Sequence, residues 1–75
     1  AQIVSLNLML ETPLTARELD ILALLAQGMR NKEIANTLFV TVDTVKKHTA
    51  GIYRKLGVSD RQRAVAEALR LGLIR

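Results

Sequence analysis

Apolar residues recur at helical spacing in four successive segments of the chain, and short polar stretches separate these segments. The first helix is predicted to run from Ala16 to Gln27. Thr15 and Glu18 form the capping-box pattern that starts such a helix, and Gly28 follows its last turn, where a left-handed cap is common. The pattern therefore predicts an all-α fold with no sheet.

The second and third predicted helices are separated by only a short turn. Asn31 is predicted to cap the second helix, which ends near Leu38. Thr41 is predicted to cap the third helix, which spans about 42–56 and stops at Gly57. A short helix, a turn and a longer helix at this spacing are typical of a helix-turn-helix.

The two ends of the chain are predicted to differ in role. Ser59 and Gln62 repeat the capping-box pattern and predict a fourth helix over about 60–71. The first dozen residues alternate in part between apolar and polar, which suits an extended segment. Because the chain does not begin with Met, we expect residues 1–13 to be a linker from a missing upstream domain. Residues 14–75 would then form the folded bundle of four helices.

The composition narrows the chemistry that such a bundle can perform. Of the 75 residues, 49% are hydrophobic and 3% are aromatic, which predicts an aliphatic core in one small domain. The chain has no Cys and one His, which argues against disulfide scaffolds and Cys- or His-rich metal sites. No apolar run approaches the roughly 20 residues that a membrane span needs. We therefore expect no metal, no cofactor and no membrane contact.

The positive charge gathers in one stretch of the chain. The formal net charge is +4, and residues 41–63 account for all of it, whereas the first forty residues carry a net charge of −1. Clustered positive charge indicates an anionic partner more strongly than the same charge spread evenly. The basic side chains of this stretch are Lys46, Lys47, Arg54, Lys55, Arg61 and Arg63, against Asp43 and Asp60.

The third predicted helix places cations and very small residues opposite an apolar stripe. Lys46 and Lys47 are long enough to reach base edges or phosphates, while Ala50 and Gly51 would let the helix approach a groove wall. The major groove of B-DNA admits one α-helix. Charged residues opposite an apolar stripe are also typical of any surface helix, so this pattern alone leaves plain solvent exposure open. Further phosphate contacts are expected from Arg54, Lys55 and Arg61.

Two other classes of function compete with nucleic-acid binding. The sequence argues against an enzyme, because His48 has no nucleophile or paired carboxylate at a spacing that would orient a base. We expect a structural or backbone-bonded role for His48. A protein-docking module, in which the basic face binds an acidic partner, stays open as the second class.

Five short motifs follow one another along residues 14–74. They are LTARE (14–18), GMRNKEIA (28–35), TVKKH (44–48), IYRKLGV (52–58) and LGL (71–73). Together they resemble the LuxR-type (LuxR/FixJ) helix-turn-helix DNA-binding domain. A sigma-factor region-four domain has a similar entry motif, but the fourth and fifth motifs favour the LuxR type.

The resemblance implies a tetrahelical helix-turn-helix domain that binds double-stranded DNA as the effector part of a bacterial, cytoplasmic transcription regulator. The third helix would enter the major groove, and Lys46, Lys47 and Ala50 fall where the family reads bases. Ala50 stands where a longer polar side chain is common, so its readout would be limited to a thymine methyl. Backbone contacts are implied at or near Asn31, Lys32, Thr44, Lys55 and Arg61, to which the charge pattern adds Arg54.

The resemblance also implies partners beyond DNA. The fourth helix is the usual dimer surface of such domains, and it offers Val65, Ala66 and Leu69 here. A homodimer on DNA is therefore expected, together with contact between the full-length regulator and RNA polymerase. The wording of the last two helices favours the MalT-like, ATP-dependent branch, although response regulators and acyl-homoserine-lactone receptors share the same end domain.

Overall fold

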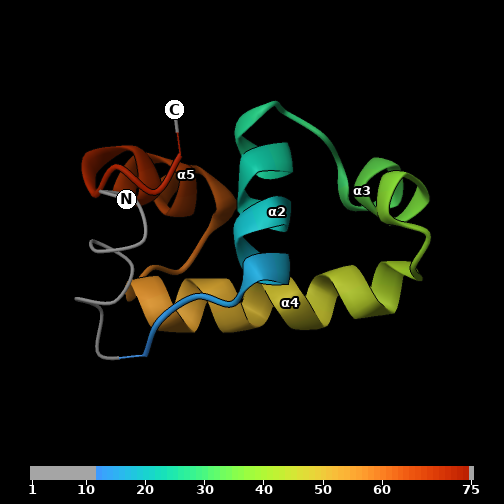
Figure 1. The fold of residues 1–75 in the computed structure, drawn as a ribbon, viewed down its shortest axis with the longest axis horizontal. Helices are drawn as coiled ribbons and strands as arrows, with labels where there is room; N and C mark the ends of the chain where they lie inside the picture. Colours follow the sequence, from blue (N-terminus) through green and yellow to red (C-terminus); the bar gives the residue numbers. More distant parts are fainter. Residues whose placement is uncertain (1–11, 75) are drawn as a thin grey trace.

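The computed structural model describes residues 12–74, and this part of the chain folds into helices joined by short turns (Figure 1). No strand occurs among the described residues, so the all-α helix-turn-helix bundle predicted from the sequence is confirmed. Nearly all of the predicted linker, residues 1–11, lies outside the described part. The helices are α2 (Ala16–Ala26), α3 (Asn31–Leu38), α4 (Val42–Leu56) and α5 (Arg61–Arg70).

Helix α4 is the longest helix among the described residues and packs against α2, α3 and α5. Figure 1 shows α4 running along one side of the molecule, with α2 above its middle, α5 above its C-terminal end and α3 above its N-terminal end. Helix α2 also packs against α5. The helix predicted to read DNA is therefore also the support on which the rest of the domain rests.

The core between these helices is aliphatic, as the composition predicts. Its largest side chains are completely buried and come from α2, α3 and α4, while Ala64 and Ala68 add the buried side of α5. Neither aromatic residue belongs to this group, because Tyr53 is half-buried and Phe39 is 94% exposed. The completely buried large residues are Ile21, Leu22, Ile34, Val45 and Ile52.

Local capping patterns account for the starts of α2 and α4. Thr15 Oγ1 accepts a hydrogen bond from the Glu18 N–H at 3.1 Å, and Glu18 Oε1 accepts one from the Thr15 N–H at 2.9 Å, which completes the predicted capping box. Thr41 Oγ1 accepts a hydrogen bond from the Thr44 N–H at 3.1 Å, as predicted for the cap of α4. Gly57 ends α4 with a left-handed φ of 70°.

Two predicted caps were wrong by one residue. Asn31 is the first residue of α3 rather than its cap; Arg30 takes the cap position, and its N–H donates to Glu33 Oε1 at 2.9 Å. Asp60, not Ser59, caps α5, and its Oδ1 accepts from the Arg63 N–H at 2.8 Å. In α5 two good capping residues stand side by side, and the charged one also interacts favourably with the positive end of the helix.

Candidate nucleic-acid interface

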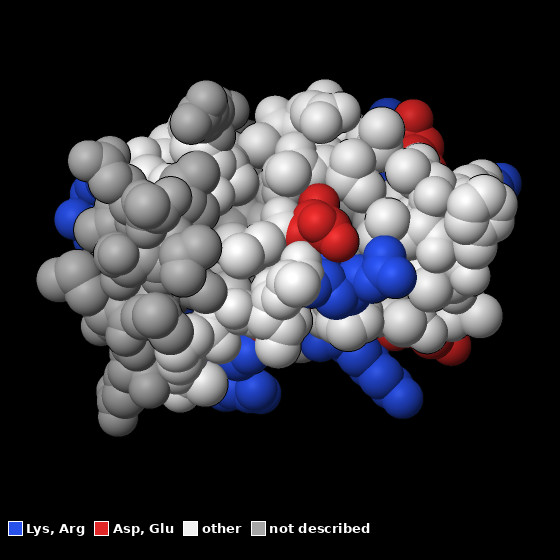
Figure 2. All heavy atoms as spheres, viewed as in Figure 1, with Lys and Arg blue, Asp and Glu red and all other residues white. Residues whose placement is uncertain are grey.

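One face of α4 points away from the rest of the domain, and we call it the outer face. Successive residues on a helix are 100° apart, so the side chains of this face fall within about a third of a turn of one another. All of its side chains are exposed. Figure 2 shows Lys and Arg atoms projecting from the edge of the molecule along which α4 runs. The outer face consists of Asp43, Lys46, Lys47, Ala50 and Arg54.

The basic side chains of the outer face are free of internal partners. Within residues 12–74, Lys46, Lys47 and Arg54 make no side-chain hydrogen bond and no ion pair. Their charges are therefore available to an anion outside the domain. Ala50 lies between them and adds no bulk, which leaves the helix backbone accessible on this side.

The N-terminal end of α4 adds polar groups beside this face. Thr44 is half-buried. Its hydroxyl is hydrogen-bonded to the Thr41 hydroxyl at 2.9 Å, so one of its hydrogen-bonding positions is already used. The unpaired N–H groups of a helix start carry partial positive charge, which favours a nearby phosphate. At the start of α3, Lys32 is exposed and Asn31 is half-exposed, and the Asn31 side chain is not used as a cap.

Two further predicted phosphate contacts have partners inside the domain. The Lys55 ammonium lies 2.5 Å from Glu18 Oε1, and the Lys55 side chain is only 12% exposed. Arg61 Nη2 donates to the backbone oxygen of Leu25 at 3.2 Å. The structure therefore does not bring Lys55 and Arg61 together with the outer face as free cations.

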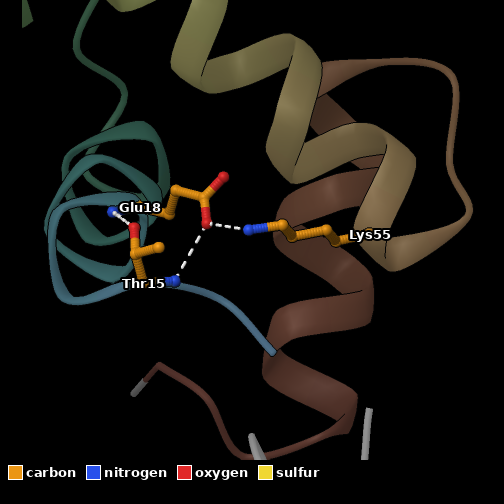
Figure 3. A network of polar contacts seen from close by, with 3 residues as sticks. All are labelled: Thr15, Glu18 and Lys55. Atoms are coloured by element: carbon orange, nitrogen blue, oxygen red, sulfur yellow. Dashed lines mark hydrogen bonds and ion pairs between the residues drawn. The ribbon is translucent and has the colours of Figure 1, made fainter. Parts of the chain in front are cut away.

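Gly51 serves packing rather than approach to a groove. It is buried, and a Cβ atom placed there would lie 2.9 Å from Glu18 Oε2 (Figure 3 shows this carboxylate). The expectation that Gly51 clears space for DNA was wrong, because this residue faces α2 and only Ala50 of the pair is exposed. Its neighbour Thr49 is also buried, and the Thr49 hydroxyl donates to the Lys46 backbone oxygen at 2.9 Å.

Glu18 makes a contact beside the candidate interface that sequence reasoning missed. Its carboxylate belongs to the capping box of α2 and also receives Lys55 from α4 (Figure 3). Burial acts to raise the pKa of Glu18, but the Lys55 ammonium and the Thr15 N–H outweigh it, so this pKa is below its ordinary value. The capping box was visible in the sequence, whereas the partner 37 residues away was not.

His48 and the surface of α5 complete the predicted set. The His48 side chain is half-exposed and makes no hydrogen bond among the described residues, which does not support a role bonded to the backbone. On α5, Ala66 is exposed, Val65 is half-buried and Leu69 is 51% exposed. Leu69 and Phe39 are the two large hydrophobic residues exposed in the described part of the chain.

Residues 12–74 contain neither a metal-binding cluster nor a membrane-spanning helix. No group of three or more His, Cys, Asp or Glu side chains is arranged to hold a metal ion there. None of these helices is both long enough and apolar enough to cross a membrane.

Comparison with known protein families identifies the chain. Residues 12–68 match the family described as bacterial regulatory proteins, luxR family. The chain belongs to the luxR family. The resemblance seen in the sequence motifs is thereby confirmed, and the chain is a helix-turn-helix DNA-binding domain of the kind found in transcription regulators.

Among relatives, this luxR-family chain is 52% identical over 61 residues to the transcriptional regulatory protein LiaR of Bacillus subtilis (strain 168), covering 81% of the chain and 29% of LiaR. It is 48% identical over 60 residues to the HTH-type transcriptional regulator MalT of Yersinia pestis (strain Pestoides F), covering 80% of the chain and 7% of MalT. The chain thus spans less than a third of either regulator. The MalT-like branch stays a prediction, because both relatives match similarly well.

Solved structures of two regulatory proteins contain the same fold. The transcription factor GerE is 40% identical with a TM-score of 0.78, and the match covers 83% of this chain and 92% of GerE. The response regulator ChrA of a heme-sensing two-component system is 44% identical with a TM-score of 0.83, covering 85% of this chain and 32% of ChrA. The match thus spans nearly all of the GerE chain and about a third of the ChrA chain.

Proposed function

We propose that this luxR-family domain binds double-stranded DNA in a sequence-specific manner, with α4 inserted in the major groove. The observation that carries the proposal is the outer face of α4, where Lys46, Lys47 and Arg54 are exposed and have no partner among residues 12–74. A groove about 12 Å wide accepts such a helix, and its phosphates complement the exposed cations. The domain acts by binding and carries out no chemical step.

Different side chains of the domain make different kinds of contact with DNA in this proposal. Lys46 and Lys47 read base edges, and Ala50 contacts at most the methyl group of a thymine. Phosphate contacts fix the position and orientation of the helix without reading sequence. Those contacts are assigned to Arg54, Lys32, Asn31 and Thr44, and we leave Lys55 and Arg61 out because both have internal partners.

We further propose that two copies bind a two-fold site through α5. The partly exposed apolar residues Val65, Ala66 and Leu69 are available for this contact, because Ala64 and Ala68 already supply the buried side of α5. Two recognition helices on such a site are separated by about 34 Å, one turn of DNA. The regulator would act in the bacterial cytoplasm, and the full-length protein would contact RNA polymerase.

The experiment that tests the reading role is a selection of bound duplexes from a random library, followed by titration of variants. Lys46→Ala and Lys47→Ala should each weaken binding to the selected duplex by about tenfold or more, and weaken binding to random duplexes much less. Arg17→Ala is the matched control, because Arg17 is an exposed cation of α2 that lies outside the outer face. Equal losses on both duplexes would show that the lysines touch only phosphate.

A second titration tests the dimer. Leu69→Glu should reduce affinity for a duplex with two half-sites and leave affinity for a single half-site unchanged. Unchanged binding to both duplexes would remove Leu69 from the interface between copies. If the wild-type domain binds no duplex at low salt, the protein-docking alternative takes the place of DNA binding, and an acidic protein partner becomes the object of the search.

A further inference from the structure

The ion pair between Glu18 and Lys55 joins two elements that are distant in sequence. Glu18 belongs to the first turn of α2, and Lys55 belongs to the last turn of α4. Both side chains are largely buried, with 7% of Glu18 and 12% of Lys55 exposed. Figure 3 shows the Lys55 side chain reaching from α4 to the Glu18 carboxylate beside Thr15. The pair therefore connects the DNA-reading helix to a fixed point in the body of the domain.

The start of α2 holds the Glu18 carboxylate in place independently of Lys55. Glu18 Oε1 accepts the Thr15 N–H at 2.9 Å as half of the capping box, and the same oxygen accepts the Lys55 ammonium at 2.5 Å. Hydrogen bonds to charged groups are shorter and stronger than those between neutral groups. Lys55 is thus attached to a group whose position the start of α2 already determines.

Gly51 brings a second point of α4 to the same carboxylate. It lies one turn before Lys55, and a Cβ atom at Gly51 would come within 2.9 Å of Glu18 Oε2. No side chain separates the α4 backbone from Glu18 at this point. One oxygen of Glu18 therefore binds Lys55, and the other lies where a Cβ of residue 51 would be. A rotation or a slide of α4 would change both of these distances.

Restricting α4 on this side also determines where its opposite side points. Ala50 directly precedes Gly51, and Lys47 lies one turn before Gly51 on the same rigid helix. Residues that read a ligand have to be held to within about 0.5 Å and 10–20° of the productive geometry. A small rotation of α4 at Gly51 would turn Lys46, Lys47 and Ala50 by the same angle.

We infer that Glu18 and Lys55 are positioning residues for sequence readout: their ion pair sets the orientation of α4, and Lys55 does not bind phosphate. This inference rests on the proposed function. If Lys55 left Glu18 for a phosphate, a mostly buried carboxylate would remain without its counter-charge, which is unfavourable. The pair therefore acts on specificity through α4, without itself touching DNA.

The test compares Lys55→Met with Arg54→Met, the adjacent cation on the outer face, in binding to the selected duplex and to random duplexes over a range of salt concentrations. Lys55→Met should weaken specific binding by about tenfold, change random binding less than about twofold and leave the salt slope unchanged. Arg54→Met should weaken binding to both duplexes and reduce the salt slope by about 0.9. All titrations use temperatures at which circular dichroism shows each variant fully folded.

Rescue and coupling separate positioning from general stability. Lys55→Arg keeps the charge and should restore most of the preference for the selected duplex. Glu18→Gln should reproduce the loss seen in Lys55→Met, and the double variant should be no worse than either single variant, because both changes break one contact. Should Lys55→Met be too unstable to titrate, Glu18→Asp, which shortens the carboxylate by one methylene, should still lower the preference for the selected duplex.

The possible outcomes distinguish this inference from the proposed function. A salt slope that falls by about 0.9 in Lys55→Met would show phosphate contact and overturn the inference. An unchanged preference in folded Lys55→Met, with specific wild-type binding, would also overturn it and leave the proposed function standing. A wild-type domain with no preferred duplex would overturn both.

Discussion

Helix α4 carries similar residues on two sides, and these residues are exposed on one side and buried on the other. Lys47 lies on the outer face of α4 and has no partner among residues 12–74, whereas Lys55 lies on the side facing α2 and is held by Glu18. Ala50 and Gly51 are adjacent and both small, yet Ala50 is exposed and Gly51 is buried against that carboxylate. The role of a lysine or a small residue here is decided by its angle relative to α2 rather than by its type.

The largest expected effect on stability comes from a substitution on the packed side of α4. Gly51→Leu should lower the free energy of unfolding by about 2 kcal/mol, because the new side chain meets Glu18 where even a Cβ lies 2.9 Å away. Ala50→Leu is the matched control, since the same side chain one residue earlier enters solvent and should leave stability within about 0.5 kcal/mol. Urea unfolding measures both, and equal midpoints would show that the two positions are equivalent.

The second effect concerns the charge on the packed side. Glu18→Gln should lower the free energy of unfolding by about 1.5 kcal/mol at neutral pH, because Lys55 loses its counter-charge. The folded-state pKa of Glu18 is lowered, so its contribution is present above the ordinary glutamate pKa of about 4.3 and is lost as the pH falls through the folded value. The gap between wild type and variant should therefore narrow below about pH 4.3 in urea titrations; a gap independent of pH would contradict this.

The third effect tests whether an exposed residue can still affect the stability of the fold. Phe39, in the turn before α4, is 94% exposed but has a left-handed φ of 59°, which is unfavourable for a residue with a Cβ. Phe39→Gly should raise the free energy of unfolding by about 1 kcal/mol, as glycine adopts this conformation readily. Phe39→Ala, which removes the ring and keeps the Cβ, is the control and should show no such gain in thermal unfolding.

The smallest effect belongs to the outer face. Lys47→Ala should change the free energy of unfolding by less than about 0.5 kcal/mol, because the side chain is exposed and makes no hydrogen bond or ion pair among the described residues. The same variant should lose affinity for the selected duplex, so that binding and stability separate. A substantial loss of stability in calorimetry would mean that Lys47 also supports the fold.

Local patterns were sufficient for the fold, and contacts between helices were not visible in the sequence. Thr15, Glu18 and Thr41 act within their own turn, so their capping roles were predictable from spacing. Asn31 and Ser59 were placed one residue out, because an adjacent position could also serve as cap. The candidate site likewise depends on contacts between residues far apart in the sequence, which local spacing does not reveal.

The outer face was predicted because its residues share one helix and differ from the apolar stripe opposite. The exposure of Lys46, Lys47 and Arg54 could therefore be predicted without knowing where the other helices lie. Gly51 and Lys55 depend on where α2 crosses α4, and helix periodicity does not contain that crossing. Glu18 was assigned one role from its own turn and has a second role across 37 residues.

Because α4 packs against α2, α3 and α5, one side of this helix is buried and holds the domain together. What is left for recognition is a narrow strip whose side chains the core does not use. Lys46, Lys47 and Ala50 can therefore be exchanged as a small set while the scaffold keeps its stability. If α4 reads DNA as proposed, a change of operator in a lineage of such regulators would then require only a few substitutions, all at positions that the core does not use.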